Sequence, residues 1–187
     1  MKTILGIDTG SSNLGWAVVR DQRLLGLGLH KPAPSRESIN TQTISRMRAL
    51  LPTIRQLIAD HQVTHLAIEL VPITNMGQRD KVLGTANMLR TVAMYEGLHY
   101  TELAANTIKK RFTGNGNAPK PLVRDIALAR YKGGGIIEPG LRPDVYDAVA
   151  VATVANWLGD NEWWHPVDTT PKAVSYTHLR AHETRGN

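Results

Sequence analysis

The sequence contains no cysteine among its 187 residues. This absence excludes disulfides, thiolate nucleophiles and cysteine zinc sites, and it suits a reducing compartment. Long apolar runs are absent too, because no window reaches the roughly 18 apolar residues of a membrane span. The N-terminal MKTILGIDTG also lacks the long apolar stretch and cleavage site of a signal peptide. We therefore expect a soluble, cytoplasmic protein.

Internal repeats and a second large lobe are also missing. The chain is long enough for one domain with a sizeable core, but too short for two large lobes. Its net charge of +6 favours a polyanionic partner such as nucleic acid. A similar charge balance is common in proteins that never bind nucleic acid, so charge alone leaves the partner open.

Hydrophobic periodicity predicts a mixed α/β fold around one sheet. Strands are expected over residues 4–7, 14–20, 23–30, 64–71 and 100–103. Helices are expected over residues 38–61, 78–97, 105–112, from 121 to about 132, and 143–158. Asp21 and Gln22 should form a tight turn between two strands, and Pro52 should kink its helix. We expect one domain over residues 1–160 and a tail over 161–187.

Two acidic residues stand in or after apolar strands. Asp8 follows the first strand, and Glu69 lies within LAIELV. A buried carboxylate is costly unless it is paired, hydrogen-bonded or bound to a metal. Each has a simpler explanation, since Asp8 could stabilise a turn and Glu69 could reach water at a strand end.

Two more acids, Asp144 and Asp147, open the apolar helix PDVYDAVAVATVANWL. Their i, i+3 spacing places both on one helix face. Acids near a helix N-terminus also complement the helix dipole, which accounts for Asp144 better than for Asp147. If the two strands and this helix are neighbours, all four acids converge and their repulsion favours a hard cation such as Mg²⁺ or Mn²⁺.

The motifs GIDTGSSNLGWAVV, AIEL and DVYDAVAVA, in this order and spacing, resemble the RuvC group of the RNase H-like superfamily. The segment TIKKRFTGNGNAPKPLV adds to the resemblance, because RuvC proteins carry a similar basic segment, a glycine-containing loop and a lysine before a helix. The resemblance covers roughly residues 3–158. It implies an RNase H-like fold with a mixed five-stranded sheet flanked by helices.

The same resemblance implies an acidic tetrad of Asp8, Glu69, Asp144 and Asp147 that binds two Mg²⁺ or Mn²⁺ ions. These ions would activate a water and stabilise the leaving 3′-oxygen, giving a 5′-phosphate and a 3′-hydroxyl. Asp8 would bridge both ions. The resemblance also implies a homodimer in which each subunit nicks one strand of a four-way (Holliday) DNA junction.

Basic residues near these motifs are candidates for DNA binding, because phosphate contacts supply most of the affinity for DNA. Lys120 is the best candidate for a phosphate near the scissile bond and is counted with the catalytic residues. A solvated surface is the alternative explanation for a charged run. The other candidates are Lys109, Lys110, Arg111 and Arg124, with weaker support for Arg79, Lys81 and Arg90.

Two features depart from the family pattern. Pro72 follows the strand glutamate, where bacterial RuvC proteins tend to carry an aromatic residue that contacts a junction base. We expect a relaxed sequence or junction preference, as in phage-type relatives. The segment AVSYTHLRAHETRGN, residues 173–187, resembles a translated sequencing adapter, so it and its histidines are excluded from the site.

Three other functions compete with this hypothesis. A sugar-kinase or actin-like ATPase shares an Asp-x-Gly motif, but it needs two lobes and a second phosphate loop. A junction-binding protein that does not cut would be expected to lack a carboxylate. Another RNase H-like nuclease, acting on other branched DNA or on RNA, is the closest rival.

Overall fold

The computed structural model describes residues 1–9, 13–31, 39–70 and 76–166, with the backbone alone described for 39–40 and 76–82. The strands are β1 (Thr3–Asp8), β2 (Leu14–Arg20), β3 (Arg23–His30), β4 (His65–Leu70) and β5 (His99–Ala104). The α-helices are α1 (Ile39–His61), α2 (Met76–Tyr95), α3 (Ala105–Thr113), α4 (Lys120–Tyr131) and α5 (Pro143–Asn156). Short 3-10 turns follow at η1 (Lys132–Gly134) and η2 (Asp160–Glu162).

The five strands form one mixed sheet in the order β3-β2-β1-β4-β5. The first three strands pair antiparallel, whereas β4 runs parallel to β1 and β5 runs parallel to β4. Asp21 and Gln22 both have positive φ angles, 46° and 64°. Two such residues make the tight hairpin turn whose twist matches that of the flanking strands. The predicted mixed five-stranded sheet is confirmed.

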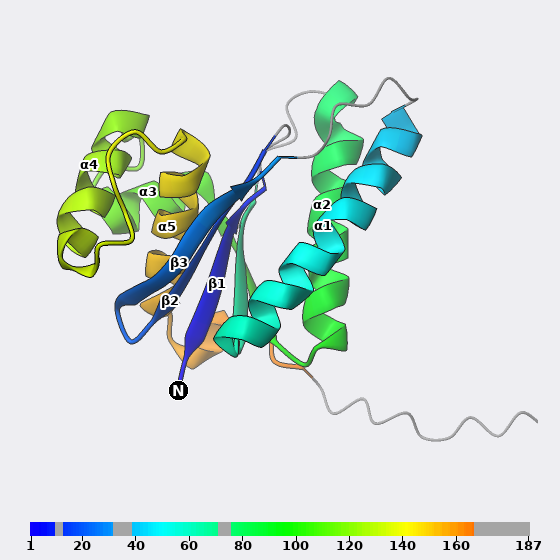
Figure 1. The fold of residues 1–187 in the computed structure, drawn as a ribbon, viewed down its shortest axis with the longest axis horizontal. Helices are drawn as coiled ribbons and strands as arrows, with labels where there is room; N and C mark the ends of the chain where they lie inside the picture. The colour runs from blue at the N-terminus through cyan, green and yellow to red at the C-terminus, as the bar shows by residue number, and fades with distance from the viewer. Residues whose placement is uncertain (10–12, 32–38, 71–75, 167–187) are drawn as a thin grey trace, which may run out of the picture.

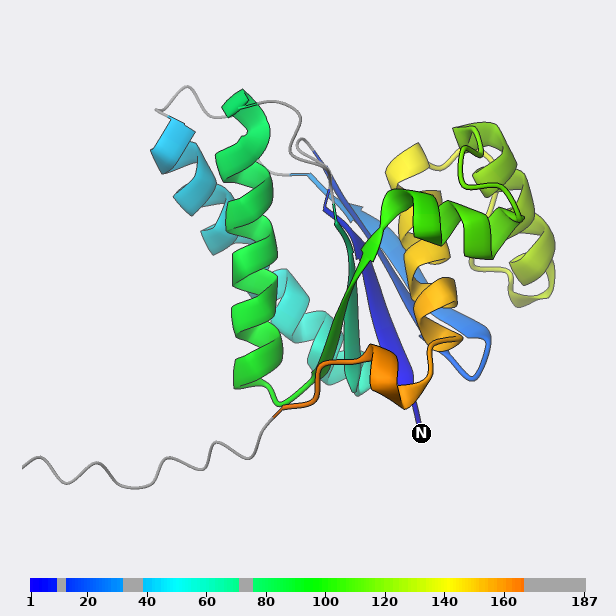
Figure 2. The ribbon, with the colours of Figure 1, turned by 180° about the vertical axis from the view of Figure 1, so that it is seen from behind.

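Helices cover both faces of this sheet (Figure 1). The pair α1 and α2 lies on one face, while α5 lies on the other with α3 and α4 outside it (Figures 1 and 2). Alternation along β1 sends Leu5 and Ile7 into the core beneath α1 and α2, and Ile4 into the core around α5. Helix α5 is apolar on nearly all sides, as expected of a helix enclosed between a sheet and other helices.

Two glycines let α5 lie directly on the sheet. A Cβ atom at Gly6 would overlap the backbone of Ala152, and one at Gly15 would overlap the carbonyl group of Asp144. Only a residue without a side chain therefore allows this approach. The close packing fixes the first turn of α5 beside the ends of β1 and β2.

Residues after α5 return to the sheet. Trp163 is buried, and Trp164 exchanges backbone hydrogen bonds of 3.0 and 2.8 Å with Tyr100 of β5. The Lys2 ammonium donates to the Leu158 carbonyl oxygen at 2.9 Å, which ties the same segment to the N-terminus. None of the helices in the described ranges is both long and apolar enough to cross a membrane. The predicted adapter-like tail lies outside the described residues.

Candidate active site

Asp8 and Glu69 stand at the ends of two adjacent parallel strands. The register pairs Ile7 of β1 with Ile68 of β4, so the two acids come next on each strand. Alternation places Asp8 on the same face as Gly6, which is the face that α5 covers. The Thr9 hydroxyl donates to the Glu69 carbonyl oxygen at 3.0 Å and joins the two strand ends.

Asp144 and Asp147 reach the same place from α5. Both lie in the first turns of the helix. This end of α5 packs closely against the sheet because Gly15 has no side chain. Their side chains are 18% and 15% exposed. The i, i+3 spacing therefore directs both carboxylates toward the strand ends rather than into solvent.

All four members of the acidic tetrad line one cavity of about 190 Å³. We call it the tetrad cavity; its other lining residues are Ile108, Lys109, Lys120, Val123 and Ala150. The acids thus come from β1, β4 and α5, while the two lysines come from α3 and α4. Apolar side chains form the remaining wall and limit how far water can solvate the carboxylates.

Burial and mutual repulsion raise the pKa values of Asp8, Glu69 and Asp147. Burial, followed by the charges of Glu69, Asp147 and Asp144, raises the pKa of Asp8 to about 8. Burial and then Asp147 raise the pKa of Glu69 to about 7, although Lys109 and Lys120 oppose the shift. Burial also raises the pKa of Asp147. A bound cation would offset this repulsion and keep the carboxylates ionised.

Each acid of α5 has a basic neighbour. The Lys120 ammonium lies 3.4 Å from Asp147 Oδ2, and the Arg142 guanidinium Nε lies 3.7 Å from Asp144 Oδ2. Asn13 Nδ2 also donates to Asp144 Oδ2, at 3.5 Å. Burial lowers the pKa of Lys120, but Asp147 and the other acids outweigh burial and raise it overall.

The donor set suits a hard divalent cation. Four carboxylates provide only oxygen ligands, which Mg²⁺ and Mn²⁺ prefer. In the part of the chain that the structure describes, no three Asp, Glu or His side chains are already gathered closely enough to hold a metal ion. The four acids line one cavity, so together they could supply oxygen ligands to a cation placed in it.

The predicted basic residues occupy different surfaces. Lys109 and Lys120 line the tetrad cavity, whereas Lys110 is exposed on α3. Arg111 pairs with Glu162 at 2.9 Å and Arg124 pairs with Asp125 at 2.7 Å. Arg90 lies away from the tetrad cavity, where it pairs with Glu102 of β5. Pro72 and the side chains of Arg79 and Lys81 lie outside the described residues.

Sequence reasoning missed Arg142, Asn13 and Thr9, which all contact the acids or their strand ends. Arg142 stands two residues before Asp144 in the segment RPD, so a basic residue next to a candidate ligand could have indicated it. Asn13 and Thr9 offered no such signal, because their contacts join segments far apart in the sequence.

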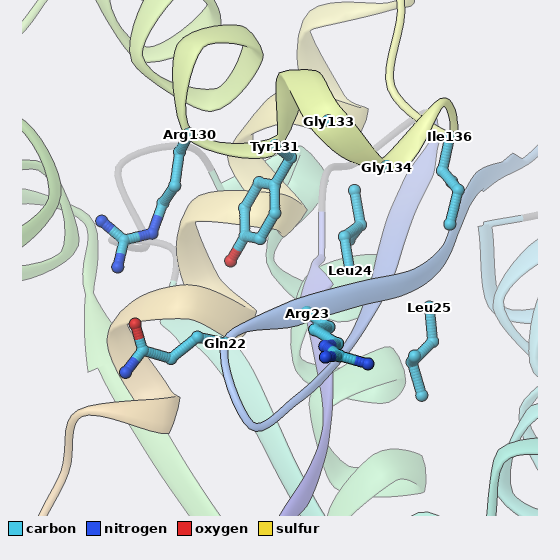
Figure 3. Close-up of a pocket in the computed structure, with 9 residues that line it drawn as sticks. All are labelled: Gln22, Arg23, Leu24, Leu25, Arg130, Tyr131, Gly133, Gly134 and Ile136. Atoms are coloured by element: carbon cyan, nitrogen blue, oxygen red, sulfur yellow. The ribbon is translucent and has the colours of Figure 1, made fainter.

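A larger cavity of about 410 Å³ lies elsewhere, between the β2–β3 turn and the end of α4 (Figure 3). Arg23 and Arg130 contribute its charged groups, and the described residues that line it include no aspartate or glutamate. The Arg130 guanidinium lies 4.7 Å from the centre of the Trp157 ring. This cavity therefore lacks the ligands for a divalent cation, and the smaller tetrad cavity is the candidate active site.

Known proteins are similar to this chain in sequence and in fold. The family model described as crossover junction endodeoxyribonuclease RuvC matches residues 4–155. The crossover junction endodeoxyribonuclease RuvC of Pseudoalteromonas atlantica is 30% identical over 167 residues, which cover 86% of this chain and 90% of the relative.

Two solved structures share the fold. Thermus thermophilus RuvC in complex with Holliday junction substrate matches with a TM-score of 0.66 and 21% identity, over 82% of this chain and 92% of that chain. The yeast mitochondrial Holliday junction resolvase Ydc2 matches with a TM-score of 0.57 and 13% identity, over 80% and 75%. The family model and the Pseudoalteromonas relative both span most of the sequence, so the resemblance predicted from the motifs is confirmed: the chain belongs to the RuvC family of crossover junction endodeoxyribonucleases.

Proposed function

We propose that this protein is a metal-dependent endonuclease that resolves four-way DNA junctions by paired nicks, leaving 5′-phosphate and 3′-hydroxyl ends. The observation that carries the proposal is the tetrad cavity, where four carboxylates from β1, β4 and α5 share one small volume with two lysines. Membership of the RuvC family supports the same activity. A cytoplasmic location is part of the proposal, since the lack of cysteine suits a reducing compartment.

Asp8, Glu69, Asp144 and Asp147 would hold the divalent cations, either Mg²⁺ or Mn²⁺. A pair of such ions, when bound, supplies activation of a water and stabilisation of the departing 3′-oxygen. Asp8 is the most buried of the acids and has the other three around it, so it would be the central member of the cation site.

Lys120 and Lys109 would bind the phosphate that is cut. The Lys120 ammonium lies 3.4 Å from Asp147 Oδ2 and lines the tetrad cavity, so a phosphate beside the acids would be within its reach. The Lys120 side chain is 59% exposed, which leaves it open to the solvent from which DNA approaches. A lysine so placed would neutralise the negative charge that develops on the phosphate in the transition state.

A wider basic surface would hold the arms of the junction. We include in it Lys110, Arg111, Arg124, Arg79 and Lys81 from the sequence, and we add Arg142 beside Asp144. Contacts of this kind are made to phosphates, so they position the DNA without reading its sequence.

We further propose that the protein acts as a homodimer, because two strands must be cut in one junction. The layer formed by α1 and α2 exposes several large apolar side chains, namely Ile44, Leu51, Met94 and Tyr95. Packing these side chains against a second copy of the chain would remove their apolar surface from water. A two-fold dimer would present two identical active sites to a substrate with matching symmetry.

The first test is cleavage of a labelled, mobile four-way DNA junction in Mg²⁺ and in Mn²⁺, beside the Asp8→Asn variant. Paired symmetric nicks that disappear in the variant are the expected result. Binding without cleavage in either ion would instead indicate a junction-recognition protein. If the protein neither binds nor cuts the junction, the proposal fails and RNA substrates become the next candidates.

A further inference from the structure

A second, smaller cavity adjoins the tetrad cavity and shares Lys120 with it. Its volume is about 170 Å³. We call it the Tyr146 pocket; it is lined by Lys120, Pro121, Arg124, Gly140, Leu141, Pro143 and Tyr146. One wall is the first turn of α4, and the other is the loop before α5 together with the start of that helix.

Hydrogen bonds hold the wall of the Tyr146 pocket in place. Tyr146 is 2% exposed, and its hydroxyl donates to the Glu138 carbonyl oxygen at 2.8 Å. The same hydroxyl accepts from the backbone N–H of Leu141 at 3.2 Å. Gly140 turns the loop with a φ of 94°, a conformation that favours glycine. The pocket therefore exists before any ligand binds.

The chemistry of the Tyr146 pocket indicates what it would accept. Its walls are mostly apolar, from Pro121, Leu141, Pro143 and Tyr146, while Lys120 and Arg124 bring positive charge. Its volume is below the roughly 300–1,000 Å³ of pockets that enclose whole small-molecule ligands. A single flat ring attached to an anion fits this combination of size, apolar surface and charge.

A nucleotide of the bound DNA strand has that chemistry, and the position of the pocket favours it over a free ligand. Lys120 belongs to both cavities, so a phosphate that it binds in the tetrad cavity would bring the next nucleotide to the Tyr146 pocket. Removing a base from its stack costs least where the stack is already broken. The branch point of a junction provides such a place.

We propose that the Tyr146 pocket receives the base of a nucleotide next to the phosphate that is cut, and that Arg124 binds the phosphate on the far side of that nucleotide. The inference rests on the proposed function, because it assumes that a DNA strand crosses the tetrad cavity. It assigns to α4 and the loop before α5 a part in choosing which bond is cut.

The test uses 2-aminopurine, whose fluorescence rises when the base leaves its stack, placed in turn at each nucleotide beside the branch point. The protein carries Asp8→Asn so that the DNA is bound without being cut. Leu141→Trp fills the Tyr146 pocket. Arg124→Ala removes one of the two basic side chains that line the pocket without repacking the core. Lys132→Ala is the matched control, because it removes one exposed charge just after α4 but away from the pocket.

We expect a severalfold rise in fluorescence at one position, abolished by Leu141→Trp and unchanged by Lys132→Ala. Loss of a stacked base typically weakens binding about tenfold or more. Arg124→Ala retains the pocket, so it should weaken junction binding in the fluorescence titration by less than that. The proposal is overturned if no position responds although a gel shift shows the junction bound. It is equally overturned if a folded Leu141→Trp protein, verified by its thermal melt, responds like its parent.

Cleavage by the otherwise wild-type protein is measured on the same junctions. Cleavage without a fluorescence change would remove the pocket proposal and leave the nuclease proposal intact. A fluorescence change that depends on Leu141, without cleavage in either ion, would support the pocket and remove the nuclease proposal. Failure to bind any junction would overturn both.

Discussion

At the scale of single residues, Asp8 governs the electrostatics of the site. Its carboxylate is buried and has Glu69, Asp144 and Asp147 around it, which together raise its pKa to about 8. Lys120 and Arg142 neutralise only part of the negative charge, because each lies nearest to an acid of α5. The metal-free protein therefore carries unfavourable charge that protonation or a divalent cation relieves.

This leads to a prediction about stability and pH. The folded pKa of Asp8 lies above its ordinary value of 3.8, so the folded state binds a proton that the unfolded state releases. The stabilisation from this proton is complete below the ordinary value and is lost as the pH rises through about 8. In EDTA, we expect the melting temperature of the wild-type protein to fall between about pH 5 and pH 8.

Asp8→Asn should flatten this dependence and melt higher than the wild type at about pH 8, by roughly 2–4 °C per kcal/mol of unfolding free energy. Mg²⁺ should raise the wild-type melting temperature at that pH much more than that of the variant. Thermal denaturation followed by circular dichroism measures both effects. Equal pH profiles for the two proteins would contradict the assigned charge repulsion.

At the scale of secondary-structure elements, the position of α5 determines whether the four acids meet. The helix supplies Asp144 and Asp147, and it approaches β1 and β2 only because Gly6 and Gly15 carry no side chain. Strand pairing then brings Glu69 beside Asp8 from the other direction. The site is therefore a product of helix–sheet packing as much as of the acids.

Gly15→Ala tests this dependence. Its Cβ atom would overlap the Asp144 carbonyl group, so we expect α5 to shift and the unfolding free energy to fall by about 1–3 kcal/mol. Junction cleavage should fall by about 100-fold, since a displacement near 1 Å can have that effect. Gly26→Ala in β3 is the control, because its nearest neighbours would lie at 3.4 Å. Unchanged cleavage by Gly15→Ala would show that the approach of α5 is not critical.

At the scale of the whole molecule, one chain offers one tetrad cavity, whereas a resolved junction needs two cuts. The cavity lies at the end of the sheet where β1 and β4 terminate, opposite the N-terminus (Figure 2). Ile44, Leu51, Met94 and Tyr95 are exposed on the α1–α2 layer, across the sheet from α5. Dimerisation through that layer would leave both cavities free to face DNA.

Mixed dimers of wild-type and Asp8→Asn subunits test the need for two active sites. If the subunits are mixed in equal amounts and exchange, about half of the dimers contain one active site. We expect these dimers to nick one strand, so that nicked but unresolved junctions accumulate. Denaturing and native gels of the same reaction distinguish nicking from resolution. If total cleavage merely halves and the share of resolved products is unchanged, one active site is enough to make both cuts.

Much of the fold was predictable because its signals are local. Alternating and helical periodicities located the strands and helices to within a few residues, and Asp21-Gln22 indicated the turn that the structure contains. The predicted boundaries differ from the observed ones mainly at helix ends. For example, α2 begins at Met76 and ends at Tyr95, whereas the predicted helix covers residues 78–97. Helix ends depend on capping and packing, which periodicity does not capture.

The sequence by itself determined the fold class and the family and predicted the four acids, because each of these depends on residue type and spacing along the chain. Only the tertiary structure decided that Lys120 neighbours Asp147 and that Lys120 lines two cavities. It also assigned Gly6 and Gly15 their role, since a glycine's effect depends on what lies above it. The two glycine contacts join segments more than a hundred residues apart, and only packing in three dimensions sets such distances.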